Sequence, residues 1–150
     1  MGEEFKLLIF RLGNQCFAAD ITDVERILNY EEPTKLPDSE SFLEGVINYQ
    51  EGILPVISLG KKFGILGSDG KEKKGSIIVA RNGDKSIGVI VEAVNEVITV
   101  SADKLEKTPD ISSNISKRYI KGLIKDKGNI ILILNLNELL SKEEKEKITG

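Results

Sequence analysis

Apolar and polar residues alternate along this chain in short runs that are separated by glycine, asparagine and proline. This pattern is typical of β-strands joined by tight turns, and it predicts a mainly β protein. Short helices are expected at 41–44, 60–64 and 101–107, with Ser101 as the N-cap of the last, and a longer C-terminal helix over 136–148. Strands are predicted at 5–12, 16–20, 46–48, 53–59, 76–80, 86–91, 94–100, 120–124 and 130–136.

The predicted strands occur twice in the same order. The segment 13–28 is similar to 83–98, and the segment 45–59 is similar to 122–136. Most of the matched positions pair one apolar residue with another, so the alternative to a true repeat is chance similarity between two β-rich segments. Two blocks in the same order, each with a matched glycine, favour duplication of one small β unit. Both copies break the period of two at one point, 21–24 and 91–94, where a β-bulge or bend is expected.

A polar, glycine-rich connector at 67–75 lies between the two copies. It lacks the spaced acidic ligands of a calcium loop, so a solvated hairpin or linker is expected. The chain is predicted to be a single domain over 1–150, with approximate subdomain segments 13–66 and 76–136. The terminal segments are expected to be exchanged between these subdomains or packed across them.

Composition excludes several classes of function. The chain has no histidine and one cysteine, Cys16, so it offers no Ser-His or Cys-His pair, no zinc site and no internal disulfide. No cofactor or metal is therefore expected, and the composition suits a reducing cytoplasm. A net charge of −3 with few aromatic residues argues against nucleic-acid binding. The longest apolar run, Ile130–Leu134, is too short to insert into a membrane.

The acidic residues do not single out a catalytic pair. Asp20, Asp23, Glu25, Glu92 and Glu96 fall on predicted loops and exposed faces, and nothing in their spacing selects two of them. An enzyme with a carboxylate-only site remains one alternative, and a small-ligand-binding or nucleic-acid-binding β-barrel remains another. The reading that the residues favour is a partner-binding module, in which an amphipathic helix or helical hairpin lies in a groove between two like subdomains.

Several segments resemble the signatures of one family. Phe42–Asn48 followed by Ile53–Leu59 resembles the F-I-x-G-V-I-N-L-R-G-x-V-x-P-V-I-D-L signature of CheW-like domains. Ile87–Val94 is similar to that family's I-G-L-V-V-D-x-V segment, and Tyr119–Gly122 to its Y-I-x-G step. The resemblance extends from about Phe5 to Leu140, nearly the whole chain.

The resemblance implies two interlocked five-stranded SH3-like β-barrels and a stand-alone, non-enzymatic adaptor of bacterial chemotaxis. Its implied partners are the regulatory domain of the histidine kinase CheA, which has the same fold, and the cytoplasmic tip of methyl-accepting chemoreceptors. Its implied location is the cytoplasm, at receptor arrays beneath the membrane. The main alternative is a small-ligand-binding or partner-binding β-barrel protein outside chemotaxis.

The chain departs from the family pattern in its charges. Arg26 stands where a glutamate is common, Tyr49-Gln50-Glu51 stands where Leu-Arg-Gly is usual, and Ser58 replaces an aspartate. Because the resemblance places the usual glutamate and arginine near the receptor surface, a reversed ion pair of Arg26 with Glu51 or Gln50 is a hypothesis. The candidate receptor-binding residues are therefore Val24, Arg26, Ile27, Asn48, Gln50 and Glu51, and no kinase-binding face is assigned.

Side-chain type divides these candidates. Arg26 and Gln50 are expected to face a partner, because polar side chains within a strand pattern point outward. The apolar residues Val24 and Ile27, like their counterparts Val94 and Val97, are expected in the barrel core rather than along a groove. Gly45 and Gly122 are expected to serve backbone geometry rather than binding.

Overall fold

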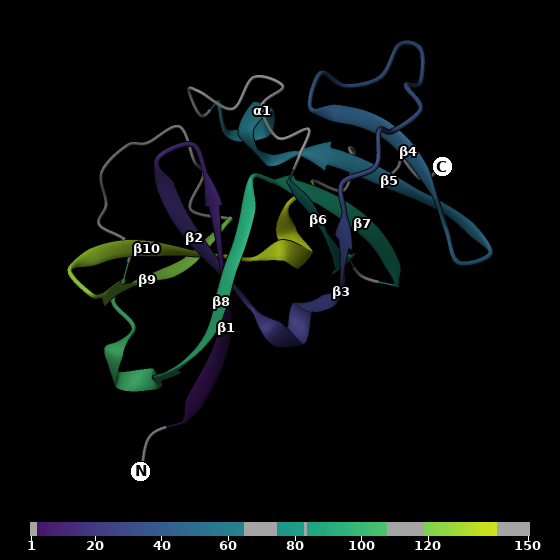
Figure 1. The fold of residues 1–150 in the computed structure, drawn as a ribbon. Helices are drawn as coiled ribbons and strands as arrows, with labels where there is room; N and C mark the ends of the chain where they lie inside the picture. Colours follow the sequence, from purple (N-terminus) through teal and green to yellow (C-terminus); the bar gives the residue numbers. More distant parts are fainter. Residues whose placement is uncertain (1–2, 65–74, 83, 108–118, 141–150) are drawn as a thin grey trace.

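The computed structural model of the chain describes residues 3–64, 75–82, 84–107 and 119–140. Within these residues the fold consists of two five-stranded sheets and one short α-helix, α1, over Leu59–Phe63 (Figure 1). The strands are β1 (Glu4–Leu12), β2 (Gln15–Asp20), β3 (Val24–Asn29), β4 (Leu43–Tyr49), β5 (Gly52–Ser58), β6 (Ser76–Asn82), β7 (Lys85–Val91), β8 (Ala93–Ser101), β9 (Ile120–Asp126) and β10 (Asn129–Leu134).

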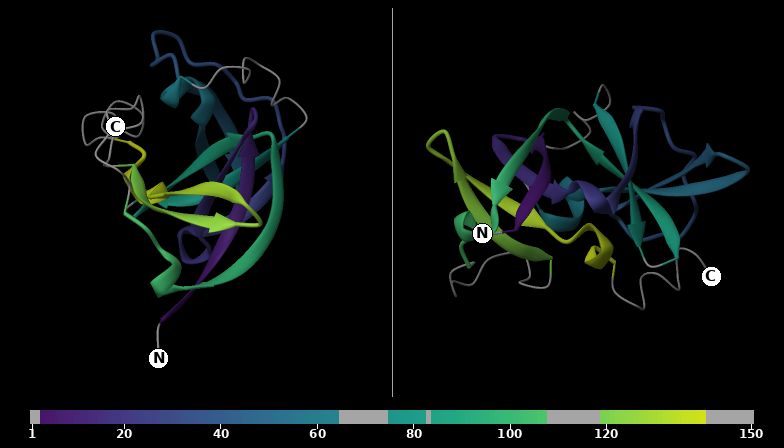
Figure 2. Two further views of the ribbon diagram at one scale, coloured as in Figure 1. Left: turned by 90° about the vertical axis from the view of Figure 1, so that its left-hand side faces the viewer. Right: turned by 90° about the horizontal axis from the view of Figure 1, so that it is seen from below.

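Each sheet combines strands from both halves of the chain. One sheet has the order β8-β1-β2-β10-β9, and the other has the order β3-β6-β7-β5-β4. In each sheet the neighbours are antiparallel except for one parallel pair, β2 with β10 and β5 with β7. Figure 2 shows that both sheets are strongly twisted. The prediction of a mainly β fold with two five-stranded subdomains is confirmed.

The sequence repeat reappears in the strand registers. In β3 the register shifts between Val24 and Arg26, so that Glu25 is the extra residue of a β-bulge. In β8 the same shift leaves Asn95 extra, at the position that corresponds to Glu25 in the repeat. The expected bulges are thus present in both copies, immediately after the predicted segments 21–24 and 91–94. The predicted repeat is confirmed.

A backbone bridge draws the two edges of each sheet together. Thr34, which follows edge strand β3, exchanges two hydrogen bonds of 2.9 Å with Val46 on the opposite edge strand β4. Glu106, which follows β8, exchanges equivalent bonds of 2.8 and 2.9 Å with Leu123 on β9. Each sheet therefore curls into a barrel.

Glycines at the two bridges allow the backbones to approach closely. Gly45 has φ 143°, and a Cβ atom built on it would lie 2.1 Å from the carbonyl oxygen of Thr34. At the corresponding position in the second copy, a Cβ atom on Gly122 would lie 3.1 Å from the carbonyl oxygen of Glu106. The geometric role expected for both glycines follows from these distances.

The described residues form three apolar clusters. One lies inside each barrel, with Leu7 and Ile124 in the first sheet and Leu54 and Ile77 in the second. The third and largest lies between the sheets and draws residues from both. Because the same inter-sheet cluster supports strands of both barrels, their relative position is fixed by apolar packing.

Two of the expected helices are not formed. Leu43 and Glu44 belong to β4, where Leu43 pairs with Ile57, so the helical turn predicted at 41–44 is wrong. Within 101–107 only Ala102–Lys104 form a 3-10 turn, and Ser101 makes no side-chain cap hydrogen bond. The bridge of Glu106 to β9 holds this segment extended instead.

Two other expected elements, the C-terminal helix and the connector between the repeats, lie only partly within the described residues. Within the predicted C-terminal helix the structure shows a 3-10 turn at Leu136–Glu138, and positions 141–148 lie outside the described residues. Most of the connector 67–75 also lies outside them. In the part of the chain that is described, no helix is long and apolar enough to cross a membrane.

Candidate partner-binding face

Strands β3 and β8 border an apolar face between the two barrels. Val24 and Val94, which correspond in the repeat, are half-buried and pack against the inter-sheet cluster. Three positions further along each strand, Ile27 is 43% exposed and Val97 is 50% exposed. We call these four residues the β3–β8 face.

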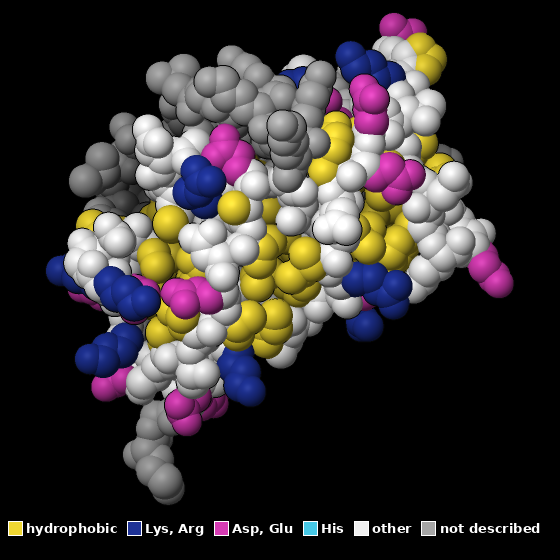
Figure 3. All heavy atoms as spheres, viewed as in Figure 1, with side chains coloured by type: hydrophobic (Ala, Val, Ile, Leu, Met, Phe, Trp, Pro, Cys, Tyr) yellow, Lys and Arg dark blue, Asp and Glu magenta, His cyan; other side chains and the backbone are white. Residues whose placement is uncertain are grey.

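The strand registers explain why all four side chains belong to one surface. Ile27 pairs with Ile78, and Val97 pairs with Leu8. Both partners are buried in the inter-sheet cluster, and directly paired residues project to the same side of a sheet. Hydrophobic surface spans the middle of the molecule between β8 and β3 in Figure 3. The expectation that Ile27 and Val97 lie in the core is therefore wrong, because β3 and β8 are edge strands with nothing packed outside them among the described residues.

A polar cluster joins β3 to β4 beside this face. The hydroxyl of Tyr49 donates a hydrogen bond of 2.6 Å to Glu25, and the hydroxyl of Ser86 donates one of 3.1 Å to the other carboxylate oxygen. The Nε atom of Arg81 lies 3.8 Å from that second oxygen. Glu25 thus connects the edge strand β3 to β4 and to the β6–β7 hairpin.

Sequence reasoning missed Glu25 and Tyr49 as a pair. The bulge in β3 leaves Glu25 without a register partner. Its carboxylate accepts a hydrogen bond from Tyr49 at the end of β4, 24 residues later in the chain. The available signal was Tyr49, a residue with a polar tip at a position where leucine is usual in the resembled family. A tyrosine hydroxyl at the end of a strand generally finds a hydrogen-bond partner.

The hydrogen bonds shift both titrations. The bond from Tyr49 is the largest cause that holds the pKa of Glu25 below its ordinary value of 4.5, with smaller contributions from Ser86 and the nearby arginines. Burial, followed by the bond to Glu25, raises the pKa of Tyr49 above its ordinary value of 10.0. The pair is therefore strongest when Glu25 is charged and Tyr49 is neutral.

Replacing Tyr49 with phenylalanine is expected to lower the free energy of unfolding by at most about 1 kcal/mol near pH 7, since the lost bond is solvent-exposed. Because folding lowers the pKa of Glu25, its contribution is present above the ordinary value of 4.5 and is lost as the pH falls through the lower folded value. Because folding raises the pKa of Tyr49, the contribution of its hydroxyl is present below the ordinary value of 10.0. It is lost as the pH rises through the higher folded value and the hydroxyl loses its proton. Urea unfolding of both proteins should show a difference in unfolding free energy at about pH 7 that shrinks as the pH falls below 4.5; a difference independent of pH would contradict this origin.

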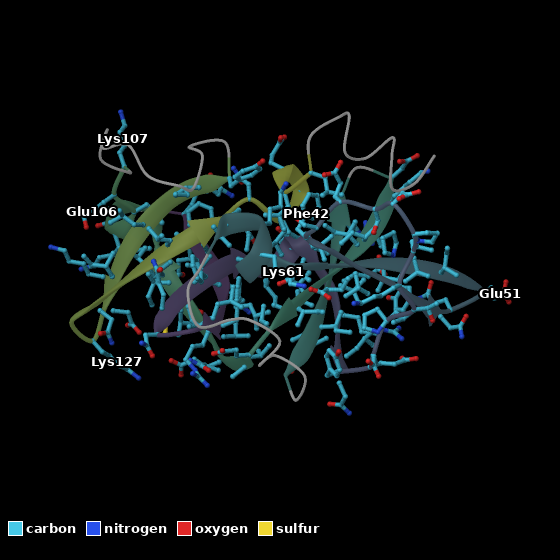
Figure 4. The ribbon with its side chains drawn as sticks, turned by 90° about the horizontal axis from the view of Figure 1, so that it is seen from above. Phe42, Glu51, Lys61, Glu106, Lys107 and Lys127 are labelled. Carbon is cyan, nitrogen blue, oxygen red and sulfur yellow. The ribbon has the colours of Figure 1, made fainter. Side chains whose placement is uncertain are left out.

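Arg26 does not form the reversed ion pair. Its guanidinium carbon lies 6.0 Å from the centre of the Tyr49 ring, and among the described ion pairs none joins Arg26 to Glu51. Gln50 occupies the left-handed region with φ 53°, and this turn carries Glu51 to the far tip of the β4–β5 hairpin (Figure 4). Lys127, which corresponds to Gln50 in the repeat, has φ 52° and lies at the other end of the molecule.

The remaining candidates spread along β4 and its turn. Asn48 is exposed on β4, whereas Tyr49, Gln50 and Glu51 help to line an open pocket of about 430 Å³ with Pro55. The structure therefore brings Val24, Arg26 and Ile27 together on β3 and places Asn48 and Gln50 on either side of Tyr49 along the chain. Glu51 is the candidate furthest along the hairpin.

The acidic residues do not gather into one site. Asp20 accepts hydrogen bonds from the backbone and hydroxyl of Thr22, and burial is the main cause that raises the pKa of neighbouring Asp23. Glu92 pairs with Arg11 at 3.3 Å. In the described ranges no group of three or more aspartate, glutamate or cysteine side chains could hold a metal ion.

Ser58 replaces an aspartate of the resembled signature and keeps a structural role. It is 2% exposed and is the N-cap of α1, where its hydroxyl accepts a hydrogen bond of 3.2 Å from the backbone of Lys61. Serine and aspartate are both favoured at this position, because each offers an oxygen to a free backbone N–H group. The change at 58 is therefore explained by local structure.

Comparison with known proteins gives a consistent result. The family model of the CheW-like domain matches residues 6–144. The chemotaxis protein CheW of Thermotoga maritima is 34% identical over 140 residues, which cover 93% of this chain and 90% of the relative. The probable chemotaxis protein CheW of Rhizobium etli is 32% identical, with coverages of 94% and 90%.

A solved structure agrees with the sequence relatives. The crystal structure of the scaffolding protein TtCheW from Thermoanaerobacter tengcongensis is similar with a TM-score of 0.86 and 33% identity, covering 97% of this chain and 93% of that one. The sequence matches and the shared architecture extend over nearly the whole chain. The protein therefore belongs to the CheW-like domain family, as a scaffold of bacterial chemotaxis and not as an enzyme.

Proposed function

We propose that this protein couples the cytoplasmic tips of methyl-accepting chemoreceptors to the regulatory domain of the histidine kinase CheA by binding both. The observation that carries the proposal is the match of the CheW-like domain over residues 6–144, together with an exposed apolar face at its centre. A scaffold needs surfaces for two partners rather than a catalytic site, and its specificity comes from a few apolar anchors within a polar rim.

The receptor tip is assigned to the β3–β8 face. An amphipathic helix or helical hairpin, the partner expected for a groove between two like subdomains, binds by laying its apolar stripe on such a surface. Ile27 and Val97 supply exposed contact area, and Val24 supports it from the inter-sheet cluster. Arg26 lies at the edge of this face, and Asn48, Gln50 and Glu51 extend the proposed contact along the β4–β5 hairpin.

The kinase must bind elsewhere if both partners are held at once. Two further exposed side chains, Ile53 at 67% and Ile130 at 58%, lie at the hairpin ends of the two barrels. Ile53 and Ile130 correspond in the repeat, so each barrel offers a similar apolar end. We assign the regulatory domain of CheA to the end that carries Ile130, because Ile53 pairs with Asn48 on the hairpin already assigned to the receptor. The protein then works in the cytoplasm, at receptor arrays beneath the membrane.

Calorimetric titration into the isolated regulatory domain of CheA from the same organism tests the kinase contact. Saturable one-to-one binding at about micromolar concentrations, weakened when Ile130 is changed to aspartate, is the expected result. Ile27→Asp serves as the matched control, because the proposal keeps that side chain out of the kinase contact. Absence of binding at protein concentrations well above this range would contradict the proposed kinase contact.

A further inference from the structure

Arg26 gives the β3–β8 face a positively charged edge. It is exposed on β3 next to Ile27, but it pairs with Val79 of the cluster inside the second barrel and so projects to the other side of the strand, where its guanidinium carbon lies near the Tyr49 ring. A guanidinium 6.0 Å from the centre of an aromatic ring is at the outer limit of a cation–π contact. Arg26 is therefore an exposed cation on the edge strand that borders the apolar face.

The carboxylate of Glu25, the residue before Arg26, already has other partners. Glu25 accepts hydrogen bonds from Tyr49 and Ser86 and lies 3.8 Å from the Nε atom of Arg81. One carboxylate thus lies near two guanidinium groups, those of Arg81 and Arg26. Among the described ion pairs, the one that Glu25 makes is with Arg81 and none includes Arg26.

The corresponding edge of the second barrel is electrically balanced. Glu96 occupies the position in β8 that Arg26 occupies in β3, and its carboxylate lies 4.0 Å from the Nζ atom of Lys127. Arg11, which corresponds to Arg81, pairs with Glu92 at 3.3 Å. The two edges of the face are therefore alike in their apolar residues and different in charge.

We infer that the receptor helix on the β3–β8 face carries an acidic side chain beside its apolar stripe, that this side chain meets Arg26, and that the contact fixes the direction of the helix. The inference rests on the proposed function. Val24 corresponds to Val94 and Ile27 to Val97, so a helix turned end for end meets nearly the same apolar surface. Apolar contacts alone therefore do not select one direction, whereas a charge at one edge only does.

The test is a charge-reversal titration. The probe is a soluble helical-hairpin fragment of a chemoreceptor tip from the same organism, prepared as the wild type and as a panel in which each acidic residue is changed in turn to lysine. Arg26→Glu is expected to weaken binding of the wild-type fragment about tenfold, because it replaces attraction with repulsion. One fragment of the panel should restore most of that affinity to Arg26→Glu while binding the wild-type protein more weakly.

Glu96→Arg is the matched control at the corresponding position. Because the contact is assigned to the β3 edge, Glu96→Arg on β8 should change the affinity for the wild-type fragment by less than about threefold. Raising the salt concentration should weaken the wild-type complex more than the Arg26→Glu complex, since screening acts on the charge contact. Circular dichroism of each variant checks that the fold is retained.

The outcomes separate this inference from the proposed function. If the wild-type protein does not bind the fragment at all, the receptor part of the proposed function fails and the inference falls with it. If the wild-type protein binds and Arg26→Glu binds equally well, the inference is overturned and the proposed function stands. Loss of binding that no fragment of the panel restores also overturns the inference, because the contact is then not a pair between Arg26 and an acidic side chain.

Discussion

Gly45→Ala is expected to lower the free energy of unfolding by about 3 kcal/mol, because it forces both a backbone change and a steric clash. The residue has φ 143°, a conformation open to glycine, and an added Cβ atom would lie 2.1 Å from the carbonyl oxygen of Thr34. That oxygen accepts the 2.9 Å hydrogen bond from Val46 that helps to close the first barrel. Relief of the clash must open this bridge.

Gly122→Ala is the matched control in the second barrel. Its added Cβ atom would lie 3.1 Å from the carbonyl oxygen of Glu106, which a small shift relieves, so a loss of about 1 kcal/mol is expected. Urea unfolding followed by circular dichroism measures both values, provided that the dependence on denaturant is unchanged. Equal losses in the two variants would contradict the assigned role of Gly45.

Ile27→Asp is expected to weaken binding of the receptor-tip fragment by about thirtyfold or more, because it replaces an apolar contact of about 2 kcal/mol with a carboxylate that binding must desolvate. Since the side chain is 43% exposed, the fold should tolerate the change. Titration of the fragment measures the loss, and thermal unfolding measures the stability.

Ile130→Asp provides the comparison for this second variant. Ile130 is 58% exposed on β10, outside the β3–β8 face, so the same chemical change should leave binding of the receptor fragment unaltered. Equal weakening by both variants would show that the loss comes from general destabilisation or added charge. Unchanged binding by Ile27→Asp would remove the β3–β8 face from the receptor contact.

The repeat made much of the fold predictable. Hydrophobic alternation placed most strands, and the shared break in period anticipated the paired bulges at Glu25 and Asn95. The repeat also relates Gln50 to Lys127, which share a positive φ in the two hairpin turns. Strand periodicity, bulges and turn conformations depend mainly on residues that are close together in the sequence, which is why they can be predicted without the structure.

What the sequence left open depends on contacts between distant segments. Ile27 and Val97 have the apolar character of core residues, and their exposure follows from the edge position of β3 and β8, which strand order alone decides. The bond between Glu25 and Tyr49 likewise needs the two edges of one sheet to meet. The expected pair of Arg26 and Glu51 failed because the hairpin carries Glu51 to the far tip.

Reconstitution of kinase activity tests the central claim most directly. CheA autophosphorylation is measured with receptor fragments assembled on vesicles, with and without this protein, and with each component also present alone. The account predicts that activity rises well above the level of any pair only when receptor, CheA and this protein are present together, and that Ile27→Asp abolishes the rise. Equal activity with and without the protein would contradict its role as the scaffold that couples receptor to kinase.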